Sequence, residues 1–78
     1  MQVRLFAAAA DAAGVRETQV EGDTLGAVLD ELVARHGERF GQVLGRCTLL
    51  LDGVRVDDPA LSVADARRLD VLPPFAGG

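Results

Sequence analysis

The residues best suited to chemistry are the last two of the sequence, Gly77 and Gly78, where we expect the chain to end in an α-carboxylate. Glycine lacks a Cβ, so this pair can thread a channel that is too narrow for other residues. A terminal carboxyl group has a pKa of about 3.3–3.7, so it is ionised and unreactive at neutral pH. Acyl transfer from Gly78 therefore requires activation, most simply as an acyl-adenylate.

The rest of the chain lacks the residues that would activate this carboxylate. The eight basic residues are all Arg, so a glycine-rich phosphate loop, which ends in Lys followed by Ser or Thr, is impossible. The dinucleotide-binding pattern G-x-G-x-x-G is absent as well. We therefore expect a partner enzyme to bind the ATP, and we expect this chain to bind no cofactor and no metal.

Residues 73–78 form the segment that would deliver the reactive group. Its two prolines lack an N–H, cannot pair inside a sheet and favour an extended path. Six extended residues reach roughly 20 Å. A frayed terminus without function is the alternative, but an apolar, proline-stiffened segment is better suited to anchoring a partner. We predict a domain over 1–72 and an extended tail over 73–78, with these partner-binding residues: Pro73, Pro74, Phe75, Ala76 and Gly77.

Length and composition limit the class of protein. A chain of 78 residues forms one domain, and 49% hydrophobic residues are too many for a disordered chain. The net charge of −4 disfavours binding to nucleic acid. No apolar run approaches the roughly 18 residues needed to span a membrane, and the lone Cys47 fits a reducing compartment. We therefore expect a cytoplasmic protein that binds neither nucleic acid nor membrane.

The spacing of apolar residues predicts the elements that hold the tail. Strands are predicted over 2–6, 16–20, 47–51, 54–56 and 69–72, and helices over 7–13 and 24–36. Thr24 can cap the longer helix, whose apolar residues recur along one face. The Asp52-Gly53 pair predicts a tight hairpin. The order indicates an α+β fold, in which the long helix packs across one mixed sheet.

Four further features are predicted to be structural. Phe40, Val43 and Leu44 predict a short apolar turn. Cys47 begins an apolar strand and is expected to be buried rather than reactive. His36 lies at the end of the long helix and has no metal-ligand partners at suitable spacing. The pair at 67–68, Arg-Arg, is expected to form a solvated face, with pairing to a partner as the alternative.

The ending Asp70-Val71-Leu72-Pro73-Pro74-Phe75-Ala76-Gly77-Gly78 resembles that of the MoaD type, the small subunit of molybdopterin synthase, within the MoaD/ThiS family of ubiquitin-like sulfur carriers. The opening Val3-Arg4-Leu5-Phe6-Ala7 and the helix start at Thr24-Leu25 match too, so the resemblance covers the whole chain. One departure is the stretch Asp65-Ala66-Arg67-Arg68, where many members have an Asp-Gly-Asp-Glu turn. The missing glycine puts the geometry of that turn in question.

The resemblance implies a ubiquitin-like β-grasp fold with a flexible C-terminal tail. It implies that an E1-like adenylyltransferase of the MoeB type adenylates Gly78. A sulfur donor, such as a cysteine desulfurase or a rhodanese-like protein, would then convert Gly78 to a thiocarboxylate. The tail would insert into a large subunit of the MoaE type and donate sulfur to precursor Z. The chain would then be a non-catalytic subunit of molybdopterin synthase.

Three other functions are compatible with the same tail. The first is sulfur transfer for thiamine or cysteine synthesis, although thiamine carriers tend to be shorter and to lack the Pro-Pro pair. The second is a protein modifier joined to lysines through Gly78. The third is an inert interaction module, in which changes at Gly78 would have no effect.

Overall fold

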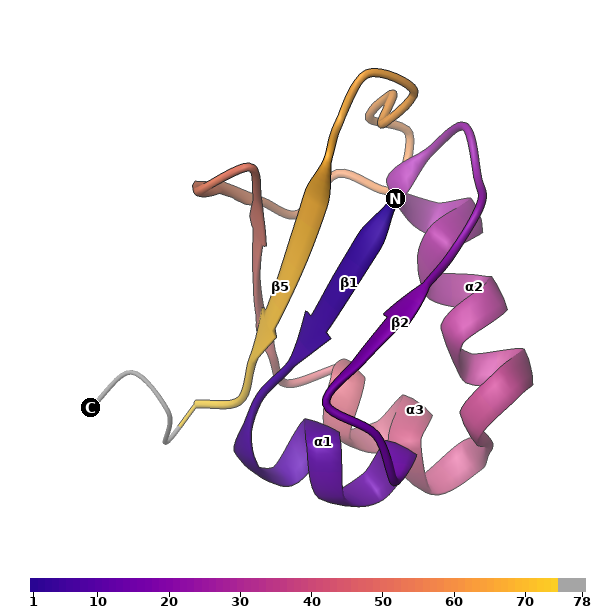
Figure 1. Ribbon diagram of the computed structural model, residues 1–78, viewed down its shortest axis with the longest axis vertical. Coiled ribbons are helices and arrows are strands. Elements are labelled where there is room, and N and C mark those ends of the chain that lie inside the picture. Colours follow the sequence, from indigo (N-terminus) through magenta and orange to yellow (C-terminus); the bar gives the residue numbers. More distant parts are fainter. Residues whose placement is uncertain (75–78) are drawn as a thin grey trace.

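The computed structural model describes residues 1–74. One mixed sheet has the strand order β2-β1-β5-β3-β4 (Figure 1). The central β5 pairs in parallel with β1 and antiparallel with β3, and the two edge strands are antiparallel to their neighbours. The strands are β1 (Gln2–Leu5), β2 (Glu17–Gln19), β3 (Thr48–Leu51), β4 (Val54–Val56) and β5 (Arg68–Leu72).

Three helices pack against one face of this sheet: α1 (Ala7–Ala13), α2 (Leu25–His36) and α3 (Glu38–Leu44). Alternate strand residues point to this face because side chains along a strand alternate between its two sides. Val3, Leu69 and Val71 are completely buried there, in one cluster with helix residues such as Leu32 and Phe40. The predicted α+β architecture, with the long helix across one mixed sheet, is therefore confirmed.

The long helix α2 begins and ends where its sequence predicts. The backbone N–H of Ala27 donates a hydrogen bond to Thr24 Oγ1 at 3.2 Å, so Thr24 caps the first turn. Gly37 ends the helix with a φ of 97°, a value that favours glycine. Leu25, Val28 and Leu32 form the buried side of the helix.

The predicted apolar turn near Phe40 is wrong, because residues 38–44 form the helix α3. The glycine at position 41 suggests a boundary from its low helix propensity, but it lies inside the helix. A Cβ at this position would lie only 3.2 Å from Cγ1 of Val33. Gly41 therefore allows α3 to approach α2 closely, and this packing buries Phe40 and Leu44.

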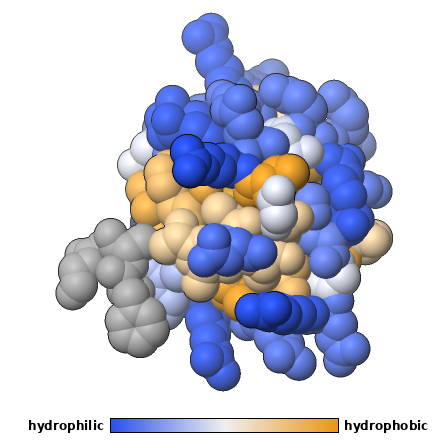
Figure 2. Space-filling model, turned by 60° about the horizontal axis from the view of Figure 1, so that its bottom comes forward, coloured by the Kyte–Doolittle hydropathy of each residue, from blue (hydrophilic) through white to orange (hydrophobic). Residues whose placement is uncertain are grey.

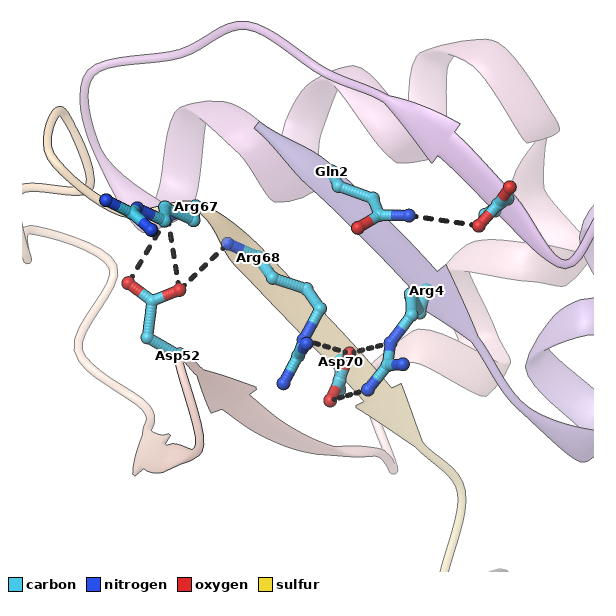
Figure 3. A network of polar contacts seen from close by, with 7 residues as sticks. Gln2, Arg4, Asp52, Arg67, Arg68 and Asp70 are labelled. Atoms are coloured by element: carbon cyan, nitrogen blue, oxygen red, sulfur yellow. Dashed lines mark hydrogen bonds and ion pairs between the residues drawn. The ribbon is translucent and has the colours of Figure 1, made fainter.

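The predicted hairpin between β3 and β4 is confirmed. Asp52 and Gly53 have φ values of 47° and 87°, as expected for a two-residue turn with both central residues at positive φ. The Asp52 carboxylate also accepts backbone N–H groups from Arg67 at 3.1 Å and from Arg68 at 2.9 Å (Figure 3). The hairpin thereby holds residues 67–68 at the start of β5. These residues belong to the stretch 65–68, which lacks the glycine found there in many members of the resembled family.

Within residues 1–74, no helix is both long enough and apolar enough to cross a membrane.

We predict that Thr24→Ala lowers the free energy of unfolding by about 1 kcal/mol, because the first turn of α2 loses its side-chain acceptor. Thr24→Ser is the matched control, since it keeps the hydroxyl group, and it should restore most of the loss. Urea unfolding followed by circular dichroism measures both variants. Equal stability of the wild-type protein and Thr24→Ala would show that the cap contributes nothing.

Candidate functional site

The C-terminal segment starts from the best-supported strand of the sheet. β5 has a hydrogen-bonded neighbour on each side, and its Val71 lies opposite Leu5 of β1 and Leu49 of β3. Leu69 and Val71 have no exposed surface. Because removal of β5 would open the core, the strand that leads to the tail is fixed by the packing of the whole domain.

The first residues after β5 show how the tail leaves the domain. Leu72 makes the last pairing with β3, opposite Thr48. Pro73 is buried and Pro74 is exposed, so the chain reaches the surface between these two residues. The Phe6 N–H donates to the Val71 carbonyl at 3.2 Å. This hydrogen bond holds the residue before α1 next to the end of β5. The remaining predicted site residues lie outside the described residues, and their roles stay predictions: Phe75, Ala76, Gly77 and Gly78.

A bidentate ion pair joins the parallel strands β1 and β5 on the face of the sheet that the helices do not cover (Figure 3). Arg4 Nε lies 2.8 Å from Oδ1 of Asp70, and Arg4 Nη2 lies 2.9 Å from Oδ2. Arg68 Nε is 3.4 Å from the same Oδ1 atom, as an ion pair without a hydrogen bond. Bidentate geometry of this kind is among the stronger polar contacts in proteins.

The pair leaves Asp70 only 6% exposed although it faces away from the core. The hydrogen bonds from Arg4 hold the pKa of the Asp70 carboxyl below its ordinary value of 3.8, against the opposing effect of burial. Arg4 also lies over the Phe6 ring, 5.6 Å from its centroid. These contacts connect the residues just before α1 with β5, the strand that leads to the tail. They therefore help to fix where the chain leaves the sheet after β5.

Sequence reasoning missed this pair for a clear reason. Arg4 and Asp70 are each ordinary polar residues in an alternating strand, and they are 66 residues apart. Only the parallel register, which places Arg4 opposite Asp70, brings them together. The prediction of a solvated face at residues 67–68 holds for one arginine only. Arg67 is exposed as predicted, whereas Arg68 is half-buried and forms an ion pair with Asp70.

The side chains of Cys47 and His36 contact neighbouring residues of the domain. The Cys47 Sγ–H donates to the Val43 carbonyl at 3.2 Å, and burial raises the pKa of the thiol. The His36 ring packs 5.2 Å from that of Phe40, measured between centroids. Among residues 1–74, no three His, Cys, Asp or Glu side chains converge as metal ligands. Cys47 and His36 therefore contact other residues of the domain, as expected for structural roles.

A mixed sheet of five strands, with helices packed across it and β5 at its centre, is the β-grasp arrangement of ubiquitin-like proteins. The ThiS family matches residues 3–78, and the chain belongs to this family of ubiquitin-like sulfur carriers. Comparison with curated proteins finds no match. The resemblance drawn from the tail is thus confirmed for the family, and the assignment to the molybdopterin type stays a prediction.

Solved structures of small archaeal modifier protein 1 (SAMP1) are similar to this chain. The crystal structure of SAMP1 from Haloferax volcanii has 31% identity and a TM-score of 0.75, and the match covers 100% of this chain and 98% of that chain. A second crystal structure of the H. volcanii protein has 30% identity, a TM-score of 0.70 and 95% coverage of both chains. The solution structure of SAMP1 from Methanosarcina acetivorans, at 23% identity, has a TM-score of 0.82 and coverage of 99% and 94%. The ubiquitin-like β-grasp fold is confirmed by these matches.

We predict that acid removes the stabilisation provided by Asp70. Because the folded-state pKa is lowered below 3.8, this stabilisation is fully present above the unfolded-state pKa and is lost as the pH falls through the folded-state value. Asp70→Asn should therefore be less stable than the wild-type protein near neutral pH, and the difference should shrink below pH 3.8. Urea unfolding across this pH range measures it. Asp30→Asn, at an exposed position of α2, is the control, and parallel pH curves for wild type and Asp70→Asn would contradict the assignment.

We also predict that Cys47 reacts slowly in the folded protein. The raised pKa leaves less thiolate at neutral pH, and partial burial restricts access. Alkylation by iodoacetamide, followed by mass spectrometry, should be at least about tenfold slower in the native protein than in urea. Equal rates in the two states would show that Cys47 is an accessible thiol.

Proposed function

We propose that this chain is the sulfur-carrying small subunit for molybdopterin synthesis, with sulfur held on the carboxyl group of Gly78. The family match, which extends through residue 78, supports a sulfur carrier. The observation that carries the choice of molybdopterin is the Pro-Pro pair before the Gly-Gly ending, which thiamine carriers tend to lack. The central position of β5 supports the carrier role, because a carrier needs its tail held at one fixed exit. The single cysteine of the chain, which fits a reducing compartment, supports a cytoplasmic location for this role.

The proposed chemistry needs two partner proteins before delivery. In an E1-like adenylyltransferase of the MoeB type, a carboxylate oxygen of Gly78 attacks the α-phosphorus of ATP and pyrophosphate leaves. The persulfide of a sulfur donor, of the cysteine desulfurase or rhodanese type, then displaces AMP from the acyl carbon and forms an acyl disulfide. A second thiol attacks the donor sulfur of this disulfide, which cleaves the S–S bond and releases the Gly78 thiocarboxylate. The thiocarboxylate enters a large subunit of the MoaE type, where its sulfur attacks precursor Z. Water then cleaves the acyl–sulfur bond, which leaves the sulfur on the product and returns Gly78 as a carboxylate.

The tail residues have distinct parts in this proposal. Pro73 and Pro74 are the stiff root, and a stiff root reduces the entropy lost when the tail docks. Phe75 anchors the tail in the partner, and Ala76 and Gly77 pass through its channel. Gly78 is the reacting residue. The small side chains near the end are required because the reacting carbon must approach a nucleotide and a sulfur nucleophile closely.

A second candidate function is protein modification through Gly78. The observation that favours it is the 31% identity to SAMP1 of H. volcanii, which is called a small archaeal modifier protein. Modification begins from the same activated acyl group, and an amine then takes the place of sulfur as the nucleophile. The described fold and the tail are compatible with both reactions, so the nature of the product at Gly78 distinguishes them.

The test is high-resolution mass spectrometry of the C-terminal peptide after incubation with ATP, the cognate E1-like enzyme and a sulfur donor. We expect one oxygen of Gly78 to be replaced by sulfur. Gly78→Ala, or one residue added after Gly78, should slow this exchange about 100-fold, because the reacting carbon is displaced. Ala60→Gly, at an exposed loop position, is the control and should react like the wild-type protein.

Two results would change the conclusion. An unmodified carboxylate in the wild-type protein under these conditions would contradict the sulfur-carrier proposal. Gly78 found in isopeptide bonds to lysines of other proteins, with no thiocarboxylate, would establish the modifier function instead. Oxidation of Met1 or Cys47 adds one oxygen, which gives the same nominal mass change as replacement of oxygen by sulfur, so the C-terminal peptide must be separated from those that contain these residues.

A further inference from the structure

A groove of about 370 Å³ lies beside the root of the tail, between α1 and α3. Its apolar lining comes from three parts of the chain: Ala8 of α1, Val43 of α3, and Pro73 with Pro74 after β5. Figure 2 shows the lower end of the molecule, where these helices lie, with an apolar area bordered by hydrophilic side chains. The first two residues of the proposed tail thus form one wall of this groove.

The polar lining of the groove comes from one side of α3 and the turn that follows it. Arg39, Gln42 and Arg46 line the groove together with Val43. Their spacing of three, four and seven residues places them on one helical face, and the Arg46 N–H continues the turn by donating to the Val43 carbonyl at 3.0 Å. The groove therefore has an apolar floor with two arginines at its rim.

The charge of the groove is opposite to that of the whole chain. The protein has 12 acidic and 8 basic residues, yet no carboxylate is found among the lining residues that the structure describes. Arg39 and Arg46 are exposed, and within residues 1–74 neither side chain has a hydrogen bond or an ion pair. By contrast, Arg4 is committed to Asp70. Two guanidinium groups that have no partner among residues 1–74 are therefore available to carboxylates of another protein.

We propose that this groove docks an acidic segment of the enzyme that activates Gly78, a segment in which an apolar side chain is flanked by carboxylates. The carboxylates would pair with Arg39 and Arg46, and the apolar side chain would cover Val43 and Ala8. This inference rests on the proposed function, because it concerns the partner that receives the tail. The apolar floor favours a protein segment over a free anion, since a free anion gains nothing from apolar surface.

Continuity with the tail favours a partner that receives Gly78, and the activating enzyme is the first such partner in the proposed sequence of reactions. A protein that draws Gly78 into its active site must pass along Pro73 and Pro74, and these residues are already part of the groove. Opposite charges at such a rim steer encounter and fix orientation more than they change chemistry. The arginines should therefore affect the concentration of carrier that the enzyme needs, and leave the rate of adenylation at saturation unchanged.

The test measures adenylation, as ATP-dependent pyrophosphate release by the cognate E1-like enzyme, against the concentration of the full-length carrier. Arg39→Glu and Arg46→Glu should each raise KM for the carrier about tenfold at low salt, with kcat within about twofold of wild type. The effect should shrink in about 0.5 M NaCl, because salt screens charges at an exposed rim. Gln42→Glu, which adds a carboxylate inside the groove without changing its shape, should raise KM in the same direction.

Arg67→Glu is the matched control. It makes the same change of charge at an exposed residue, but Arg67 precedes β5 and thus lies at the opposite end of that strand from the groove. Its contact with Asp52 is made by the backbone N–H, which the substitution keeps. We expect its KM to stay within about twofold of wild type. Thermal unfolding by circular dichroism confirms that each variant is folded.

The outcomes separate the two proposals. If the wild-type carrier is adenylated and the groove variants have the KM of Arg67→Glu, docking in the groove is wrong and the proposed function stands. If the groove variants lower kcat at unchanged KM, the arginines act on the chemical step, and docking is again wrong. If the wild-type carrier is not adenylated at any concentration, the proposed function fails and the docking inference falls with it.

Discussion

The position of β5 between β1 and β3 is the constraint on which the rest of the structure depends. β1 starts at Gln2 and β5 ends at Leu72, so almost the whole chain lies between two strands that pair directly. Every helix and both edge strands belong to the connection that brings these strands together. Long-range parallel pairing of this kind forms only after a large loss of chain entropy, so it depends on burial of Leu69 and Val71 against the helices.

Arg4 and Asp70 give this pairing its register. A slip by one residue would turn Leu69 and Val71 to the open face and bring Asp70 into the core. In the observed register the carboxylate is matched by two hydrogen bonds from Arg4, whereas in a shifted register it would be buried without a partner. The pair thus contributes specificity as well as stability. Since the tail follows β5 directly, the same register determines where Pro73 leaves the sheet.

The features that sequence could predict depend on neighbouring residues. The Thr24 cap and the Asp52-Gly53 turn are local, and both are present as predicted. The tail motif was readable because its order along the chain is itself the signal. The prediction of a turn at Gly41 was wrong because it used only the low helix propensity of glycine, which is a local property. A glycine is needed at this position because α3 packs closely against Val33 of α2. The Arg4–Asp70 pair and the groove depend on tertiary neighbours, so no pattern within a single segment predicts them.

The exclusive use of arginine connects the stability of this protein with its proposed chemistry. An acyl-adenylate reacts with amines, and a surface lysine close to the tail would be a competing nucleophile. A guanidinium group stays protonated under all ordinary conditions and is a poor nucleophile, yet it pairs with carboxylates better than an amine does. Four of the eight arginines pair with Asp70 or line the groove, and none of the eight offers a side-chain amine to the proposed acyl-adenylate at Gly78. In the proposed function, positive charge presented to the activating partner as guanidinium groups therefore does not compete for the activated acyl group.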